Sequence, residues 1–185
     1  ILELKKKFKN IYYIFREKKT GIGSAHKEGI KYCYKNDYNL IITMDCDGTH
    51  DPIYLKNLIS KSKLNDYVIT SRFKKKGLIK DWPLNRKFIT YLRHYLIYIF
   101  LGINFDASGA YRCFLTSKIK LNDILAAKNN SYAFFWEVTH QLNKKGYKIY
   151  EIPVRLVYRT LGKSKMSFKH IINSFLYLLK LTLNR

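Results

Sequence analysis

The chain has 185 residues, the size of one domain, and 47% of them are hydrophobic, which is enough for a core and excludes a disordered chain. Lys and Arg outnumber Asp and Glu by 35 to 13, so the net charge of +22 favours polyanionic partners such as nucleic acid, anionic lipid or phosphorylated substrates. Three cysteines are too few for a disulfide framework and indicate a reducing compartment, and no run reaches the roughly 18 apolar residues of a membrane-spanning helix.

Extended and helical patterns alternate along the chain, which predicts an α/β layer fold. In the first half we expect a strand at residues 11–15, a turn at 21–24 with Ser24 as a helix N-cap, and a buried strand at 38–44. Asp51 and Pro52 have the residue types of a helix start, because Asp caps and Pro suits the first helical position. A short strand follows at residues 67–70.

The second half begins with a basic loop at residues 72–80. We then expect a helix at 84–101, a strand at 110–115, a helix at 134–144, and a strand at 147–156 that Pro153 assigns to a sheet edge. The predicted inward face of the helix at 84–101 consists of Phe88, Leu92, Tyr95, Leu96 and Ile99.

The C-terminal segment carries apolar residues at helical spacing with Lys around them. We therefore divide the chain into a catalytic domain at residues 1–160 and a basic amphipathic helix at 161–185. This helix either lies on an anionic membrane surface or packs against its own domain.

Two aspartates, Asp45 and Asp47, stand at the carboxyl end of the predicted strand 38–44. Residues two apart in an extended segment point the same way, so the two carboxylates are expected to converge. Ligands of open α/β sheets bind at strand carboxyl ends, and Mg²⁺ or Mn²⁺ takes hard oxygen ligands of this kind. The pattern predicts a divalent-cation site, and the alternative is a solvated surface loop.

Four further groups of residues are candidates for substrate contacts. Gly21 and Gly23 either let the backbone approach a phosphate or sugar, or form an ordinary turn. Glu137, in an apolar setting, is either paired or functional. The remaining candidates are Asp106, Ser108 and Arg112, which also fit a hairpin with a salt bridge, and Arg159, Ser164 and Lys165, which also fit a solvated basic loop.

Taken together, the order and spacing of these segments resemble the family 2 glycosyltransferases, and within them the dolichyl- and polyprenyl-phosphate mannosyltransferases. The matching segments are residues 21–29, 44–52, 70–72, 85–87, 106–112, 132–137, 151–154 and 159–165. The resemblance implies a nucleotide-diphosphosugar transferase (GT-A type) fold with a mostly parallel sheet.

The resemblance also implies roles for individual residues. Asp45 and Asp47 would hold the donor diphosphate through Mg²⁺ or Mn²⁺, with Thr49 as a weaker third residue of the metal site. The basic positions that would cradle donor and acceptor phosphates are Arg72, Arg86, Arg159 and Lys165. Members of the family carry earlier strands that bind the nucleotide, and this sequence lacks them, so we expect a fragment whose N-terminal strands come from a separate segment or chain.

The expected function is metal-dependent, inverting transfer of a hexose, mannose in the first place, from a nucleotide diphosphosugar to a polyprenyl or dolichyl phosphate. An ionised phosphate attacks without a general base, whereas a hydroxyl acceptor needs a carboxylate, for which Glu137 or Asp106 would serve. We expect a protein bound peripherally to the cytoplasmic face of a membrane. The alternatives are hexose transfer to a cell-surface glycan, an inactive fragment, and a basic nucleic-acid-binding module, although we expect no nucleic acid.

Overall fold

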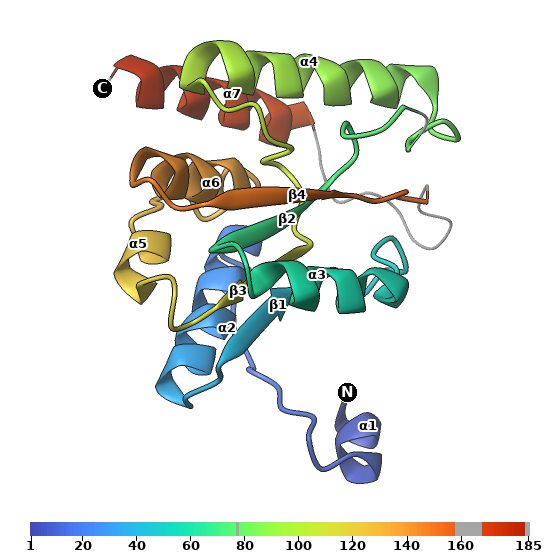
Figure 1. The fold of residues 1–185 in the computed structure, drawn as a ribbon, viewed down its shortest axis with the longest axis vertical. Coiled ribbons are helices and arrows are strands. Elements are labelled where there is room, and N and C mark those ends of the chain that lie inside the picture. The colour runs from blue at the N-terminus through green and yellow to red at the C-terminus, as the bar shows by residue number, and fades with distance from the viewer. Residues whose placement is uncertain (77, 158–167, 184–185) are drawn as a thin grey trace.

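A mixed four-stranded sheet forms the centre of the computed structural model, which describes residues 1–76, 78–157 and 168–183 (Figure 1). Its strands, in spatial order, are β1 (Leu40–Thr43), β3 (Arg112–Leu115), β2 (Tyr67–Ser71) and β4 (Ile149–Pro153). β3 runs antiparallel to both β1 and β2, whereas β2 and β4 are parallel. Three strands thus share one direction and β3 reverses it, so the sheet is mixed where the sequence analysis expected mostly parallel pairing.

Helices cover both faces of this sheet, as an α/β layer fold requires. On one face α3 (Leu55–Ser62) packs its buried Leu58 against Val68 of β2. On the other face lie α2 (Ile22–Lys35), α5 (Leu121–Leu125) and α6 (Phe134–Lys144), whose apolar residues contact Tyr67 and Ile69 of the same strand. The alternation along β2 places successive side chains in opposite cores, and every residue of this strand is buried.

A further layer, formed by α4 (Leu84–Leu101) and α7 (Phe168–Leu183), lies beyond α6 (Figure 1). Ile97 and Leu101 of α4 pack with Leu178 of α7 and Trp136 of α6 in one apolar cluster. The C-terminal helix therefore packs on its own domain along this side. Across the described ranges, no helix is both long and apolar enough to span a bilayer.

The N-terminal segment corrects one prediction. The chain begins with a short helix, α1 (Leu2–Lys7), set apart from the sheet, and residues 11–15 form no strand (Figure 1). Phe15 is 82% exposed. A strand needs a hydrogen-bonding neighbour as well as apolar residues, and no described strand lies beside this segment.

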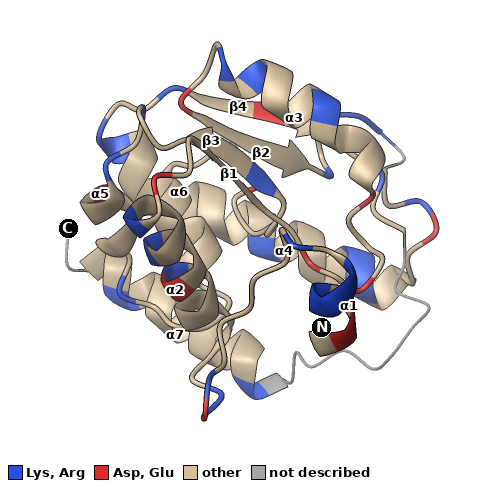
Figure 2. Ribbon diagram, turned by 90° about the horizontal axis from the view of Figure 1, so that it is seen from below, with Lys and Arg blue, Asp and Glu red and all other residues tan. Residues whose placement is uncertain are grey.

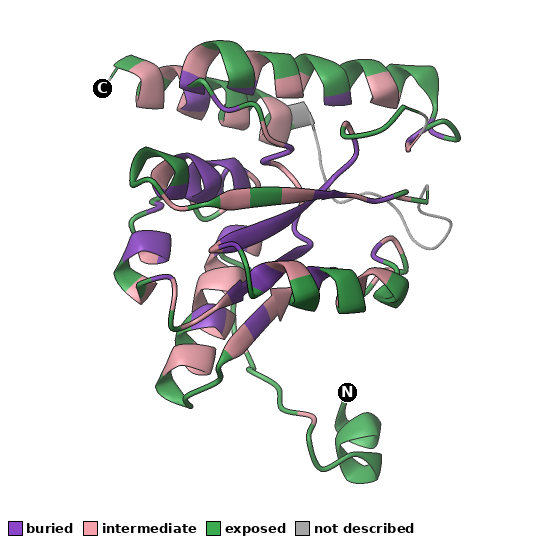
Figure 3. Ribbon diagram, viewed as in Figure 1, coloured by how far each residue is buried: buried purple, intermediate pink, exposed green. Residues whose placement is uncertain are grey.

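The inward face predicted for α4 was right for Leu96, which packs against the apolar cluster of Ile97 and Leu101, and wrong for the other four residues. Phe88 is 68% exposed and Tyr95 is 59% exposed, while Thr90, Ile97 and Leu101 are the buried positions (Figure 3). Of the other residues expected to face inward, Leu92 and Ile99 are exposed as well. Apolar residues occur around most of this helix, so their periodicity does not select one face.

Of the predictions based on single residues, those for Asp51 and Pro153 were confirmed and the one for Ser24 was wrong. Asp51 accepts a hydrogen bond from the Ile53 N–H as N-cap of a 3₁₀ turn (Pro52–Tyr54) that leads into α3, and Pro153 lies on an edge strand, both as predicted. Ser24 is not an N-cap, because α2 begins at Ile22 and Ser24 donates back to the Gly21 carbonyl.

Candidate functional site

The candidate metal ligands lie in a turn after β1. The backbone N–H of Asp45 donates to His50 Nδ1 at 2.7 Å. Asp47 Oδ1 accepts from the Thr49 N–H at 3.1 Å and from the Thr49 hydroxyl at 2.6 Å. β1 ends at Thr43, before both aspartates, and the chain turns at Gly48, which has φ of 80°, so Asp45 and Asp47 lie in this turn and not in the strand.

His50 anchors this turn to the sheet. Its ring stacks on Tyr111, with 4.9 Å between ring centroids, and the Tyr111 hydroxyl donates to the Asp51 carbonyl. Burial lowers the pKa of His50, Asp45 opposes that shift, and Arg72 adds to it. A neutral imidazole is the form whose Nδ1 accepts the Asp45 N–H, so the lowered pKa and the hydrogen bond support each other.

The residues of this turn fit a cation that is shared with a substrate. Over the residues that the structure describes, no group of three or more His, Cys, Asp or Glu side chains is placed to hold a metal alone. Mg²⁺ usually takes one or two protein carboxylates together with substrate phosphates, which matches Asp45, Asp47 and a diphosphate. The Thr49 hydroxyl donates its hydrogen to Asp47, so the Thr49 hydroxyl oxygen lies beside that carboxylate.

A buried ion pair joins the end of β2 to the loop before β3. Arg72 donates to Asp106 Oδ2 from its backbone N–H at 2.9 Å and from Nε at 2.7 Å, and its Nη2 donates to Asp106 Oδ1 and to Ser108 Oγ. The Asp106 N–H donates in turn to Glu151 Oε1 at 2.6 Å. Burial alone would raise the pKa of Asp106, but the charge and hydrogen bonds of Arg72 outweigh it and lower that pKa to about 2.

Arg112, predicted as a phosphate contact, is buried and donates its hydrogen bonds to groups of the protein. It is 2% exposed, and its guanidinium donates to the carbonyls of Gly109 and Ala107 and to the Tyr67 hydroxyl. These bonds shape the loop that carries Asp106. The structure therefore shows Arg112 positioning that loop, because the side chain is buried and each of its three nitrogens already donates to a protein group.

Glu137, predicted as catalytic, likewise holds a loop. Its carboxylate is 1% exposed and accepts from the N–H groups of Lys128 and Asn129 at 2.8 and 2.9 Å. The Tyr177 hydroxyl of α7 donates to it as well, at 2.9 Å. Both oxygens are engaged, so in this structure Glu137 ties α6, the loop at 128–131 and α7 together.

Gly21 and Gly23 face that same loop. An added Cβ at Gly21 would stand 2.1 Å from the Asn130 carbonyl oxygen, and one at Gly23 would stand 2.6 Å from Phe134 Cβ. The missing side chains make room for protein and not for a phosphate at these two points. Gly21 also has φ of 110°, which side-chain-bearing residues rarely adopt.

Of the remaining candidate phosphate contacts, Arg86 lies within the described residues and the others do not. The Arg86 guanidinium lies 4.6 Å from the centroid of the Trp82 ring at the start of α4, a cation–π contact. Arg159, Ser164 and Lys165 lie outside the described residues, so their phosphate contacts stay predictions. Lys and Arg are spread over α1, α2, α3 and the loops (Figure 2).

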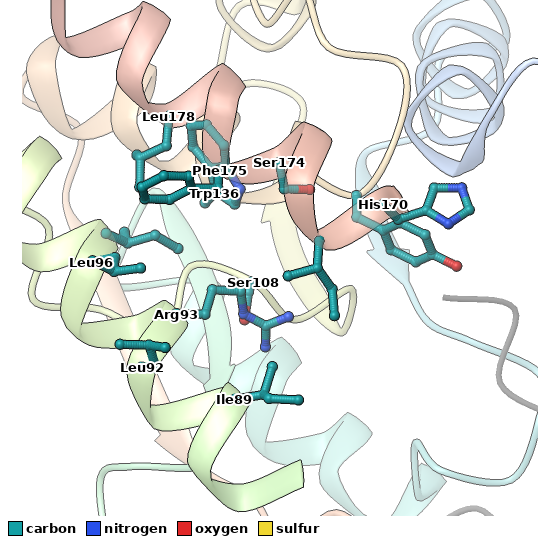
Figure 4. A pocket seen from close by; sticks show the side chains of 13 residues that line it. Ile89, Leu92, Arg93, Leu96, Ser108, Trp136, His170, Ser174, Phe175 and Leu178 are labelled. Carbon is teal, nitrogen blue, oxygen red and sulfur yellow. The ribbon is translucent and has the colours of Figure 1, made fainter. Parts of the chain in front are cut away.

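A pocket of about 310 Å³ between α4 and α7 was not expected from the sequence (Figure 4). Its walls are mainly apolar and include Leu92 and Leu96 of α4, Phe175 and Leu178 of α7, and Trp136 of α6. The helices that form the pocket are far apart in the sequence. Its existence depends on α4 packing beside α7, which no local sequence pattern predicts.

Polar groups connect this pocket to the two clusters already described. Arg93 and Ser108 both line it, and Ser108 accepts from Arg72. Tyr132 lines it too, and burial, followed by the charge of Asp45, raises the pKa of its hydroxyl. Ser108 thus connects the Arg72 ion pair to the wall of this apolar pocket, and the charge of Asp45 acts on Tyr132 at the same wall.

Comparison with known proteins gives related sequences. Undecaprenyl-phosphate mannosyltransferase of Micrococcus luteus is 31% identical over 159 residues, which cover 85% of this chain and 65% of that protein. Polyprenol monophosphomannose synthase of Mycolicibacterium smegmatis is 27% identical over 163 residues, 87% of this chain and 62% of that protein. The chain thus spans a little under two thirds of the length of these curated relatives.

A solved structure from Desulfovibrio desulfuricans G20, provisionally assigned as a nucleotide-diphospho-sugar transferase, aligns with 90% of this chain and 64% of its own at a TM-score of 0.43 and 11% identity, a likeness too low to support any argument. The family model is decisive, because the model of Glycosyl transferase family 2 matches residues 1–121, more than half of the chain. The chain belongs to glycosyl transferase family 2.

Proposed function

We propose that the protein transfers a hexose, mannose in the first place, from a nucleotide diphosphosugar to a polyprenyl phosphate, with inversion at the anomeric carbon and with Mg²⁺ or Mn²⁺ as cofactor. The observation that carries this proposal is an apolar pocket with polar groups among its lining residues, Arg93, Ser108 and Tyr132, in a family 2 chain. The names of the two curated relatives favour a polyprenyl phosphate and mannose.

On the donor side, Asp45 and Asp47 are the proposed cation ligands. When bound, the cation offsets the negative charge that develops on the departing nucleoside diphosphate. Arg86 is proposed to contact phosphate, as are Arg159, Ser164 and Lys165, because charge-assisted bonds to phosphate are strong. Arg72 serves through its ion pair with Asp106, which fixes the end of β2 next to the turn.

On the acceptor side, the two carboxylates expected as general bases for a hydroxyl acceptor, Asp106 and Glu137, are poorly suited to that role. Asp106, with its pKa lowered to about 2, is a poor proton acceptor, and Glu137 is enclosed by three hydrogen bonds. A phosphate monoester is mostly ionised near neutral pH and needs no base. These carboxylates therefore favour a phosphate acceptor over the hydroxyl of a glycan. Direct attack by that phosphate, opposite the leaving diphosphate, gives inversion.

The proposed location is the cytoplasmic face of a membrane. Apolar residues of α4 and α7 remain exposed, including Phe88, Tyr95, Ile172 and Leu176. Such a surface on a protein of net charge +22 suits an anionic bilayer. In this proposal residues 1–160 belong to the catalytic domain and residues 161–185 to the membrane-facing segment, in which α7 faces the lipid together with α4.

β1 lies at an edge of the described sheet, where strands from a separate segment or chain would pair. β1 has β3 as its one neighbour in the described sheet, so its other edge carries backbone groups that a further strand would pair. We propose that nucleotide-binding strands join here.

The acceptor test uses the full-length protein with Mg²⁺, a panel of nucleotide hexoses, and either polyprenyl phosphate or polyprenol. Transfer is expected to the phosphate and not to the alcohol, and a chelator should stop it. Transfer to polyprenol or to a glycan hydroxyl, without transfer to the phosphate, would overturn the proposed acceptor.

The metal role is tested by Asp47→Asn, which should lower turnover about 100-fold or more while the melting temperature stays close to that of the parent. Asp37→Asn is the matched control, because Asp37 is exposed with φ of 55°, a conformation that Asn tolerates. Equal turnover in Asp47→Asn and the control would remove the proposed metal role.

A further inference from the structure

Glu151 carries a mostly enclosed carboxylate that belongs neither to the aspartate turn nor to the ion pair of Arg72. It lies on β4, at the edge of the sheet, beside Ile69 of β2 in parallel register (Figure 1). Its side chain is 7% exposed, and the Asp106 N–H donates to its Oε1 at 2.6 Å. A carboxylate so far removed from water is unfavourable unless its oxygens are used, so its partners indicate what it does there.

The partners of Glu151 all lie next to the Arg72–Asp106 ion pair. Its carboxylate accepts from the Asp106 N–H and from the side chain of Ser71, the residue before Arg72. Lys74 Nζ, two residues after Arg72, lies 4.0 Å from Glu151 Oε2. One carboxylate thus contacts the chain on both sides of Arg72 and at Asp106, and so holds the two halves of the ion pair together.

The ion pair reaches the pocket between α4 and α7 through Ser108. Arg72 Nη2 donates to Ser108 Oγ at 2.6 Å, and Ser108 lines the pocket. Arg112 donates to two carbonyls of the same loop, and the Asp106 N–H is the point at which β4 fixes the start of that loop. A displacement of Asp106 would therefore move Arg72 and Ser108 with it.

The position of Glu151 calls for a hydrogen-bond acceptor more than for a negative charge. Burial raises the pKa of Glu151, and the hydrogen bonds from the Asp106 N–H and the Ser71 side chain offset that shift only in part. A raised pKa means that the surroundings disfavour the charged form of a carboxyl group. Lys74 is 58% exposed and 4.0 Å away, so its pairing with Glu151 contributes little. An uncharged oxygen in the same place would still accept from the Asp106 N–H.

We propose that Glu151 is a positioning residue of the transferase, which fixes the backbone of Asp106 and thereby keeps Arg72 bound to Ser108 at the pocket wall. The acceptor oxygen of Glu151 performs this role, and its charge does not. The effect of Glu151 on sugar transfer rests on the proposed function, whereas its hold on the Asp106 N–H does not.

Two conservative substitutions separate the reach of this side chain from its charge. Glu151→Gln keeps the length and one carbonyl oxygen but loses the charge, whereas Glu151→Asp keeps the charge and is one methylene shorter. Positioning by the oxygen predicts that the Gln variant behaves like the parent and that the Asp variant is defective. A role in proton transfer or charge stabilisation predicts the reverse order. Glu17→Gln and Glu17→Asp, at an exposed glutamate, are the matched controls and should both behave like the parent.

Hydrogen exchange of the full-length protein without substrate tests the contact itself, read by mass spectrometry on peptides that contain Asp106. In Glu151→Asp these peptides should exchange about tenfold faster than in the parent, because the amide loses its acceptor. The increase should be larger there than in α3 or α6, since a general loss of stability would raise all of them alike. Parent-like exchange in Glu151→Asp, or exchange in Glu151→Gln as fast as in Glu151→Asp, would overturn the positioning role.

Steady-state kinetics of sugar transfer measure the consequence. Turnover of Glu151→Asp should fall about 10- to 100-fold, because small displacements of positioning groups cost this much. Glu151→Gln should stay within about threefold of the parent and share its pH profile from about pH 5 to 8. A Gln variant slower than the Asp variant, or a pH profile that changes with this substitution, would contradict a role without charge. If the parent transfers no sugar to polyprenyl phosphate, the proposed function fails, and hydrogen exchange still decides whether Glu151 positions Asp106.

Discussion

The carboxyl edge of the sheet and the layer of α4 and α7 differ in whether the protein itself supplies partners for their arginine side chains. At the sheet edge, Arg72 has Asp106 and Arg112 has carbonyls, so every guanidinium is held by the protein. In the α4–α7 layer, Arg93 lines an apolar pocket, and its buried Nε has no hydrogen-bond partner among the described residues. The first region pairs its guanidinium groups within the protein, whereas the second leaves a buried donor unsatisfied.

The same contrast holds for apolar surface. The sheet buries residues on both faces of β2, while α4 leaves Phe88 and Tyr95 exposed (Figure 3). Stability should therefore depend on the sheet edge, and binding should depend on the α4–α7 layer. Substitutions in the two regions distinguish these roles.

The largest effect is expected for Asp106→Asn. Removing this carboxylate leaves Arg72 buried without its partner, which typically costs about 3–5 kcal/mol of the free energy of unfolding. Denaturant unfolding measures it. Asp81→Asn, which breaks the exposed pair with Arg155, is the matched control and should barely change stability. Equal and small effects in both variants would contradict a structural role for the Arg72–Asp106 pair.

A second effect depends on pH. Burial, with the charges of Arg112 and His50, lowers the pKa of His26 from 6.5 to about 4. The folded state thus favours the neutral ring, so this contribution is complete above pH 6.5 and is lost as pH falls towards 4, by up to about 3 kcal/mol. Stability measured against pH should fall less steeply in His26→Phe over this range. Identical slopes in parent and variant would contradict the lowered pKa of His26 in the folded state.

The close contact at the start of α2 gives an intermediate effect. Gly23→Ala places a methyl group against Phe134 Cβ and the Asn130 carbonyl carbon, and overpacking of this kind costs about 1–3 kcal/mol. Gly29→Ala, in the same helix with no atom within 4 Å of its added Cβ, should be neutral or stabilising by up to about 1 kcal/mol. Thermal unfolding of the pair checks this, and a reversed order would contradict the packing.

The smallest effect on stability is expected on α4. A double change, Phe88→Ser with Tyr95→Ser, should alter the free energy of unfolding by no more than about 0.5 kcal/mol per site, because both side chains are exposed. Its co-sedimentation with anionic vesicles should fall nonetheless. Ile53→Ser, also at an exposed apolar residue, is the control and should sediment like the parent. Undiminished sedimentation of the double variant would remove the membrane role of α4.

The sequence anticipated those features that depend on local chemistry. The apolar runs of β1 and β2, the extents of α4 and α6, and the Asp51 cap follow from patterns within a few residues. The failures are long-range. The segment at 11–15 has strand-like residues but no strand beside it, and the exposed face of α4 depends on where α7 packs.

The site divides in the same way. The Asp45–Asp47 turn was found because two acids follow an apolar strand, whereas Arg93 was missed because it looks like any other basic residue of α4 until α7 encloses it. Glu137 and Arg112 drew attention as charges in apolar settings. Their internal partners, the backbone groups of residues 128–129 and 107–109, are contacts that no residue pattern specifies.

The most direct test of this account is photo-crosslinking of the full-length protein with a farnesyl phosphate that carries a benzophenone on its chain, followed by peptide mass spectrometry. The account predicts label in α4 (Leu84–Leu101) and α7 (Phe168–Leu183), reduced by excess polyprenyl phosphate and by Arg93→Gln. Label confined to other elements, or label that excess polyprenyl phosphate does not displace, would contradict an acceptor site between these two helices.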